Sequence, residues 1–197
     1  MKASGQGDPK PLYGQTIKMM DRAGKLGFEG ASDAKQLQTS LERDRALARR
    51  GLGNFDAAMK ELTASLGKSN SNLQLQIEAA KTLQMWGVVG KRKKALEEAL
   101  GGSGKYTNPK TNRKGRLVWG WKFLVDVLKN KKKYKSTFHE CFLHWLETKF
   151  EYAKTVNNTN AIKNILKDIE NARKRNPDLG GFKDGFSKLE SMIKAHK

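Results

Sequence analysis

The chain contains one short turn pattern twice, and this repetition limits the folds that it can adopt. Gly53-Asn54-Phe55-Asp56-Ala57-Ala58 is followed 37 residues later by Gly90-Lys91-Arg92-Lys93-Lys94-Ala95. In each copy, a glycine suited to a turn precedes by five residues an alanine that begins a new apolar stripe. Recurrence at such a spacing is typical of helical repeat arrays, which usually act as binding scaffolds. The pattern therefore predicts a helical array and favours a binding protein over an enzyme.

Apolar residues recur at intervals of three and four along most of the chain, which predicts amphipathic α-helices. The expected helices span residues 34–50, 55–66, 73–86, 95–100, 117–128, 134–152, 161–172 and 182–193, with a weaker helix over 12–26. We find no segment with the alternating apolar and polar residues of a half-buried β-strand. The sequence therefore predicts an all-α fold built from antiparallel helix hairpins.

Length and composition favour a single domain for these helices. The 197 residues are 37% hydrophobic, which is enough for a substantial core. Residues 1–10 are polar, and we expect a flexible tail there, followed by one helical-repeat domain over residues 11–197. Residues 101–115 contain much glycine, lysine and asparagine, so we expect a long basic loop, a kind of segment that is usually functional or mobile.

The sequence also indicates the cellular compartment and the classes of ligand. Cys141 is the single cysteine, so a disulfide framework or a cysteine-based metal site is not expected. The N-terminus lacks the apolar core of a signal peptide, and no stretch approaches the roughly 20 apolar residues of a membrane span. We expect a cytoplasmic protein with no membrane association, no cofactor and no small-molecule substrate.

A small residue precedes the first turn, and an aromatic residue follows the turn glycine by two positions. These matching residues are Ala46, Gly53, Phe55 and Ala58. In this combination the chain resembles the tetratricopeptide repeat family. The second copy keeps the glycine and the alanine and has Arg92 at the aromatic position.

Two more divergent copies can be placed in the C-terminal half. One uses Trp121 to Tyr134, with Lys132 in place of the glycine, and the other uses Tyr152 to Pro177, with Asn160 at the turn. The turns are 37, 42 and 28 residues apart, whereas the family keeps about 34. The shortest spacing implies that the long aromatic helix serves two hairpins or that the last third is a helical bundle.

The resemblance implies a right-handed stack of helix pairs whose concave face binds a partner protein or peptide. It therefore implies a non-enzymatic interaction scaffold, with contacts supplied by the first helix of each hairpin. Basic residues there could bind the carboxylates of an acidic peptide, since arginine offers paired donors. The residues expected to do so are Arg45, Arg49, Arg50 and Lys81.

The basic charge of the chain supports an alternative function. The formal net charge is +19, and residues 101–135 contain 11 lysines and arginines against one acid, Asp126. Such a charge attracts polyanions, so the alternative is binding of RNA or another polyanion around residues 91–135, with Tyr106 stacking on a base. Solvated surface charge also explains these residues. The expected polyanion-binding residues are Lys91, Arg92, Lys93, Lys94, Lys105, Tyr106, Lys110, Arg113, Lys114, Arg116, Lys131, Lys132, Lys133 and Lys135.

Three residues of one predicted helix, His139, Cys141 and His144, have side chains that can bind metals. Their separations of two, three and five residues do not bring all three to one helix face. Glu140 and His144 do share a face, and we expect them to form a hydrogen-bonded pair. The sequence therefore predicts no metal site and no catalytic residue.

Overall fold

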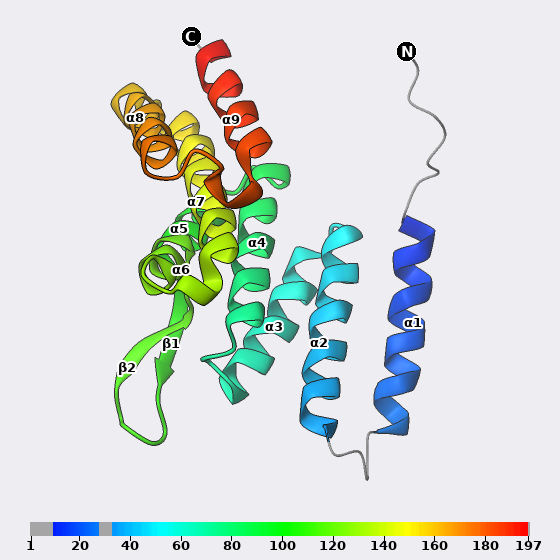
Figure 1. The fold of residues 1–197 in the computed structure, drawn as a ribbon. Helices are drawn as coiled ribbons and strands as arrows, with labels where there is room; N and C mark the ends of the chain where they lie inside the picture. The colour runs from blue at the N-terminus through cyan, green and yellow to red at the C-terminus, as the bar shows by residue number, and fades with distance from the viewer. Residues whose placement is uncertain (1–9, 28–32, 197) are drawn as a thin grey trace.

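The computed structural model describes residues 10–27 and 33–196, so nearly all of the expected tail over 1–10 lies outside the described residues. The described α-helices are α1 (Lys10–Leu26), α2 (Ala34–Gly51), α3 (Phe55–Lys68), α4 (Leu73–Val89), α5 (Lys93–Gly101), α6 (Trp121–Leu128), α7 (Lys135–Thr155), α8 (Thr159–Arg175) and α9 (Lys183–Ala195). The structure also contains two 3₁₀ helices, η1 (Lys132–Tyr134) and η2 (Leu179–Gly181), and two strands, β1 (Ser103–Thr107) and β2 (Lys114–Val118), among the described residues. The fold is all-α apart from one hairpin (Figure 1).

The helices pack chiefly on their neighbours in the sequence. Helices α1 to α4 form a row, with α1 at its outer edge, and α5 returns along α4 (Figure 1). Helix α7 contacts α4, α5, α6, α8 and α9, so the long aromatic helix does serve more than one hairpin. This packing agrees with the predicted helical array, and none of the described helices is long and apolar enough to cross a membrane.

Asparagine side chains define the start of three helices. Asn54, Asn72 and Asn158 each accept a hydrogen bond from the backbone N–H three residues later, over 2.9–3.2 Å. Each such cap satisfies a backbone donor that the helix leaves unpaired and stabilises the helix by about 1 kcal/mol.

The two copies of the turn pattern use their glycines differently. Gly53 has the left-handed φ of +79° that glycine adopts without strain. In the second copy, Lys91 takes the left-handed conformation, with φ of +50°. Gly90 serves close packing instead, because a Cβ there would lie 2.7 Å from the carbonyl oxygen of Trp86. The sequence repeat is therefore not a repeat of backbone conformation.

The core has two parts that meet along α7. The first lies among α2 to α7 and encloses Trp121, Leu124 and Cys141, which are fully buried. The second joins α7 to α8 and α9 around Phe150 and Phe186. Trp121, Phe150 and Phe186 are therefore core residues, and most other aromatic residues of the C-terminal half are partly buried and pack against the two clusters.

The segment expected to be a loop over residues 101–115 is largely an antiparallel β-hairpin. Strand β1 pairs with β2 from Ser103 opposite Val118 to Thr107 opposite Lys114. The expectation that the chain has no strand is wrong, and the helix expected over 117–128 begins only at Trp121. A two-stranded hairpin is marginal alone, so it depends on contacts with α3 and α4 that local sequence patterns do not show.

Candidate nucleic-acid interface

A groove of about 710 Å³ lies where the β-hairpin meets α6 and the turn between α3 and α4. We call it the hairpin groove. The hairpin projects beyond the helices at this end of the molecule (Figure 1). The lining residues are Asn70, Gly101, Tyr106, Asn108, Arg113, Lys114, Gly115, Arg116, Trp119, Lys122, Phe123 and Asp126.

Two amide side chains hold the base of the hairpin against the helices. Asn70 Nδ2 donates to the carbonyl oxygen of Leu117 at 2.7 Å, and Gln76 Nε2 donates to the same oxygen at 3.0 Å. Gln76 Oε1 also accepts the backbone N–H of Trp119 at 2.7 Å. Gln76 is fully buried, and a buried amide with its hydrogen bonds satisfied gives the segment one preferred position.

The tip of the hairpin is shaped by an asparagine. Asn108 Oδ1 accepts the backbone N–H of Lys110 at 2.9 Å and that of Thr111 at 3.2 Å. Asn112 has a left-handed φ of +52°, a conformation that asparagine tolerates better than most residues. The sequence 108–113, with Asn-Pro at its start, was the signal that could have revealed this turn.

An aromatic surface forms one side of the groove. The rings of Trp119 and Phe123 meet edge to face, with centroids 5.0 Å apart. Trp119 Nε1 also donates to Asn70 Oδ1 at 3.1 Å, which fixes the indole ring. The Phe123 side chain nevertheless remains 50% exposed, although burial would stabilise it. Helical spacing alone would place Phe123 in the core, because periodicity does not show which part of a helix reaches solvent.

Basic side chains from the hairpin and α6 surround this aromatic surface. Arg113, Lys114 and Lys122 line the groove, and none of them belongs to an ion pair found among the described residues. Arg116 instead supports the hairpin, because its Nη1 donates to the carbonyl oxygens of Gly101 and Gly102. Lys122 was missing from the expected polyanion-binding residues.

The remaining expected residues of the hairpin do not line the groove. Lys105 stands opposite Arg116 in the paired strands, an arrangement of like charges that destabilises a hairpin. Lys110 is exposed in the turn between the strands.

The expected basic surface around residues 91–135 falls into three separate groups. The cluster Lys91–Lys94 begins α5, whereas the hairpin follows the other end of that helix. Within the cluster, the Arg92 guanidinium lies 4.2 Å from the centroid of the Trp86 ring. Lys93 lies 3.8 Å from Glu97. The cluster is therefore not part of the hairpin groove.

The third group lies at the turn between α6 and α7. Lys131, Lys132 and Lys135 line a different groove of about 550 Å³ beside Phe138, and we call it the η1 groove. Lys133 lies over the ring of Tyr134 instead, 5.7 Å from its centroid.

The four basic residues expected to bind an acidic peptide are paired within the chain. Arg45 and Arg49 both contact the Glu61 carboxylate, at 2.8 and 3.1 Å. Arg45 also contacts Asp21, at 3.2 Å. Burial raises the pKa of Glu61 even though both arginines favour its charged form. These residues connect α1, α2 and α3.

Arg50 and Lys81, which were also expected to bind an acidic peptide, form ion pairs within the chain as well. Arg50 contacts Glu78 at 2.9 Å, and Lys81 contacts Glu140 of α7 at 2.7 Å. The chain's own carboxylates thus occupy the groups that were expected to bind a partner.

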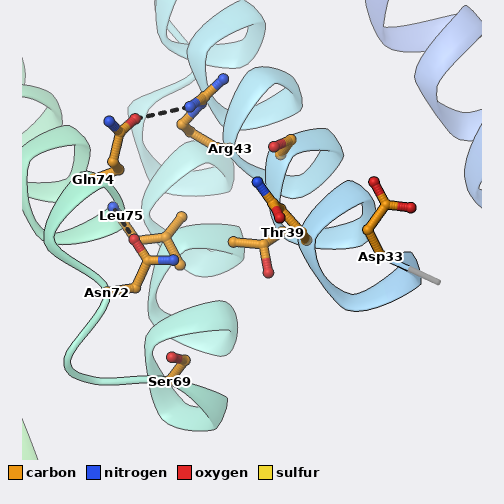
Figure 2. A pocket seen from close by; sticks show the side chains of 9 residues that line it. Asp33, Thr39, Arg43, Ser69, Asn72, Gln74 and Leu75 are labelled. Atoms are coloured by element: carbon orange, nitrogen blue, oxygen red, sulfur yellow. Dashed lines mark hydrogen bonds between the residues drawn. The ribbon is translucent and has the colours of Figure 1, made fainter.

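A polar groove nevertheless lies between the first helices of the first two hairpins. We call this groove of about 700 Å³ the α2–α4 groove. Figure 2 shows Thr39 and Arg43 on α2 facing Asn72 and Gln74 across it, and Arg43 Nη1 donates to Gln74 Oε1 at 2.9 Å. The position fits the expected partner-binding face, but the residues differ from the expected set.

The metal-binding side chains of α7 lie in three different environments. Burial raises the pKa of the Cys141 thiol to about 12, so the thiol stays protonated. His139 contacts Asn176 at 2.8 Å, and His144 contacts Glu147 at 3.0 Å. The expected pair of Glu140 and His144 is wrong, because Glu140 binds Lys81 instead. Over residues 10–27 and 33–196, no three His, Cys, Asp or Glu residues are placed to hold a metal ion.

Comparisons with known proteins identify no relative: no protein-family model matches the chain, and no curated protein or solved structure matches it significantly.

Proposed function

We propose that this protein binds single-stranded RNA in the hairpin groove. The observation that carries the proposal is that the half-exposed Phe123 ring lines the same groove as the cations Arg113, Lys114 and Lys122. Single-stranded nucleic acids bind where basic side chains follow the phosphates and aromatic rings stack on the bases. A duplex keeps its bases stacked on one another, so an exposed ring favours a single strand. We also propose that the protein acts in the cytoplasm, as expected from its sequence.

Rigid support adds to this argument. The hydrogen bonds of Gln76 and Asn70 hold β2 and Trp119 in place before any ligand arrives. Because this part of the protein is already ordered, it loses little conformational entropy when a ligand binds, which favours affinity.

The test measures polarisation of a fluorescent uracil octamer, as RNA and as DNA, over a series of salt concentrations. We expect the double variant Arg113→Gln, Lys122→Gln to weaken binding at least tenfold and to lower the magnitude of the salt slope by about 1.4. The matched control is Lys131→Gln, Lys132→Gln, which removes the same charge from the η1 groove. Equal losses in both variants would contradict a specific groove and indicate attraction by overall charge alone.

Stacking is tested separately from charge. We expect Phe123→Ala to lower affinity about tenfold, since the loss of base stacking costs about 1–3 kcal/mol. The control is Met192→Ala, which removes an exposed apolar side chain on α9. An unchanged affinity in Phe123→Ala would exclude the ring from the interface.

The α2–α4 groove supports a second candidate function, an adaptor that binds a peptide. We infer that the helix pairs are divergent tetratricopeptide repeats, a family in which the first helices of successive pairs present the partner surface. The α2–α4 groove lies between two such helices. The test is an array of acidic, neutral and basic peptides probed with the wild type and with Arg43→Gln. A peptide that binds the wild type but not the variant would support the adaptor.

A further inference from the structure

The hairpin groove contains one carboxylate among its cations. Asp126 lies one helical turn after Phe123 on α6, and residues three apart on a helix share a face. Its nearest cation is Lys129, with 3.8 Å between Nζ and Oδ1. Both side chains are 55% exposed, and such pairs contribute little to stability. The carboxylate therefore keeps acceptor capacity for a ligand in the groove.

A carboxylate at this position opposes phosphate binding, so its contribution must be to another part of the ligand. A base stacked on Phe123 would present its edge toward the next turn of α6, where Asp126 lies. An ionised carboxylate accepts two hydrogen bonds side by side. It therefore selects a base edge that offers two adjacent donors.

Guanine meets this requirement better than the other bases. Its Watson–Crick edge offers N1–H and the N2 amino group next to each other. Adenine and cytosine each offer one amino group beside an unprotonated ring nitrogen, and uracil offers one N–H between two carbonyl oxygens. The acceptors on those three edges repel a carboxylate.

We infer that Asp126 gives the hairpin groove a preference for guanine, by accepting N1–H and N2–H from a base stacked on Phe123. This inference rests on the proposed function, because it requires single-stranded RNA in the groove. For a bidentate contact to a base at a partly exposed site, we expect about a tenfold preference.

The experiment compares uracil octamers in which one central position is guanine, inosine, adenine or cytosine. Inosine keeps N1–H and lacks the 2-amino group, so it isolates one of the two hydrogen bonds. We expect the octamer with a central guanine to bind about tenfold more tightly than the octamers with a central adenine or cytosine. The inosine octamer should have an intermediate affinity.

The variant Asp126→Asn should bind all four octamers with similar affinity. Asp184→Asn removes a carboxylate from α9, outside the groove, and should keep the preference for guanine. A wild type that binds all octamers equally, or that prefers cytosine, would overturn the inference. The proposed function would survive that result as long as binding still depends on Phe123. Failure of every octamer to bind would overturn both.

Discussion

Gln76 and Trp119 are 43 positions apart in the chain, and the Gln76 Oε1 accepts the Trp119 backbone N–H at 2.7 Å. The same glutamine donates to the carbonyl oxygens of Asn70 and Leu117. One buried side chain therefore joins α4, the preceding turn and the end of β2. The position of the hairpin groove depends on this connection.

We expect Gln76→Leu to release the hairpin. The change leaves the partly buried N–H of Trp119 and carbonyl of Asn70 without these partners, and each polar group left unsatisfied costs up to about 1–3 kcal/mol. Hydrogen exchange of the amides in residues 114–119 should therefore become faster. The control Gln74→Leu changes an exposed glutamine of the same helix, and equal exchange in both variants would contradict the role of Gln76.

The glycines at the two ends of β2 give a matched pair of stability predictions. A Cβ on Gly120 would lie 2.3 Å from the backbone nitrogen of Gly102, whereas a Cβ on Gly115 meets nothing within 4 Å. We expect Gly120→Ala to lower the free energy of unfolding by about 1–3 kcal/mol, as overpacking does, and Gly115→Ala to change it little. Urea denaturation measures both, and similar losses would show that the close contact of the two backbones is unimportant.

Glu42 gives a prediction about pH. Burial alone would raise the pKa of this carboxyl, but hydrogen bonds from Gln38 and Ser65 and the nearby Lys68 lower it below its ordinary value of 4.5. A lowered pKa in the folded state stabilises the fold above the unfolded pKa, and this stability is lost as pH falls through the folded pKa.

The variant Ser65→Ala removes one of these hydrogen bonds. We expect a loss of about 1 kcal/mol in unfolding free energy at pH 7 and a smaller loss at an acidic pH below the folded-state pKa of Glu42. Urea denaturation at both pH values gives the comparison, with Ser191→Ala on α9 as control. A loss that is the same at both pH values would mean that Ser65 acts through packing.

The left-handed backbone of Lys91 offers a stabilising change. A residue with a Cβ costs about 1–2 kcal/mol in this conformation, and glycine avoids that cost. Glycine also raises the conformational entropy of the unfolded chain, which offsets part of the gain. We expect Lys91→Gly to raise the free energy of unfolding by a few tenths to about 1 kcal/mol. Lys91→Ala removes the same charge and keeps the strain, so an equal gain in both variants would assign the effect to charge.

Helical periodicity was sufficient to predict most of the fold. The stripe of Phe55, Leu62 and Leu66 marks α3, and the stripe of Ile162, Ile165 and Ile169 marks α8, because each helix buries one face. The hairpin escaped prediction because its strands are short and mostly exposed, and Gln76, far away in the sequence, holds them. Polar contacts between distant segments leave no periodic signal.

The site could be predicted only in part, for the same reason. Charge density identified Arg113 and Lys114, which do line the hairpin groove. It also included Arg92, which lies on Trp86, and the resemblance to tetratricopeptide repeats added Arg45, which binds Glu61. Composition counts a charge but does not show whether another side chain of the chain already neutralises it. Phe123 and Lys122 were missed because helix exposure depends on how α6 meets the hairpin.

The hairpin leaves the helices at Gly102 and rejoins them at Gly120, and the backbones of these two glycines touch. The helices α5 and α6 would therefore keep their relative positions if the exposed tip of the hairpin between the glycines were lengthened, shortened or exchanged. The groove contacts supplied by Arg113 and Lys114 could then change within the hairpin, while those of Lys122, Phe123 and Asp126 stay with the helical array. In this protein, part of the recognition surface is therefore encoded apart from the helices, and the rest lies on α6 itself.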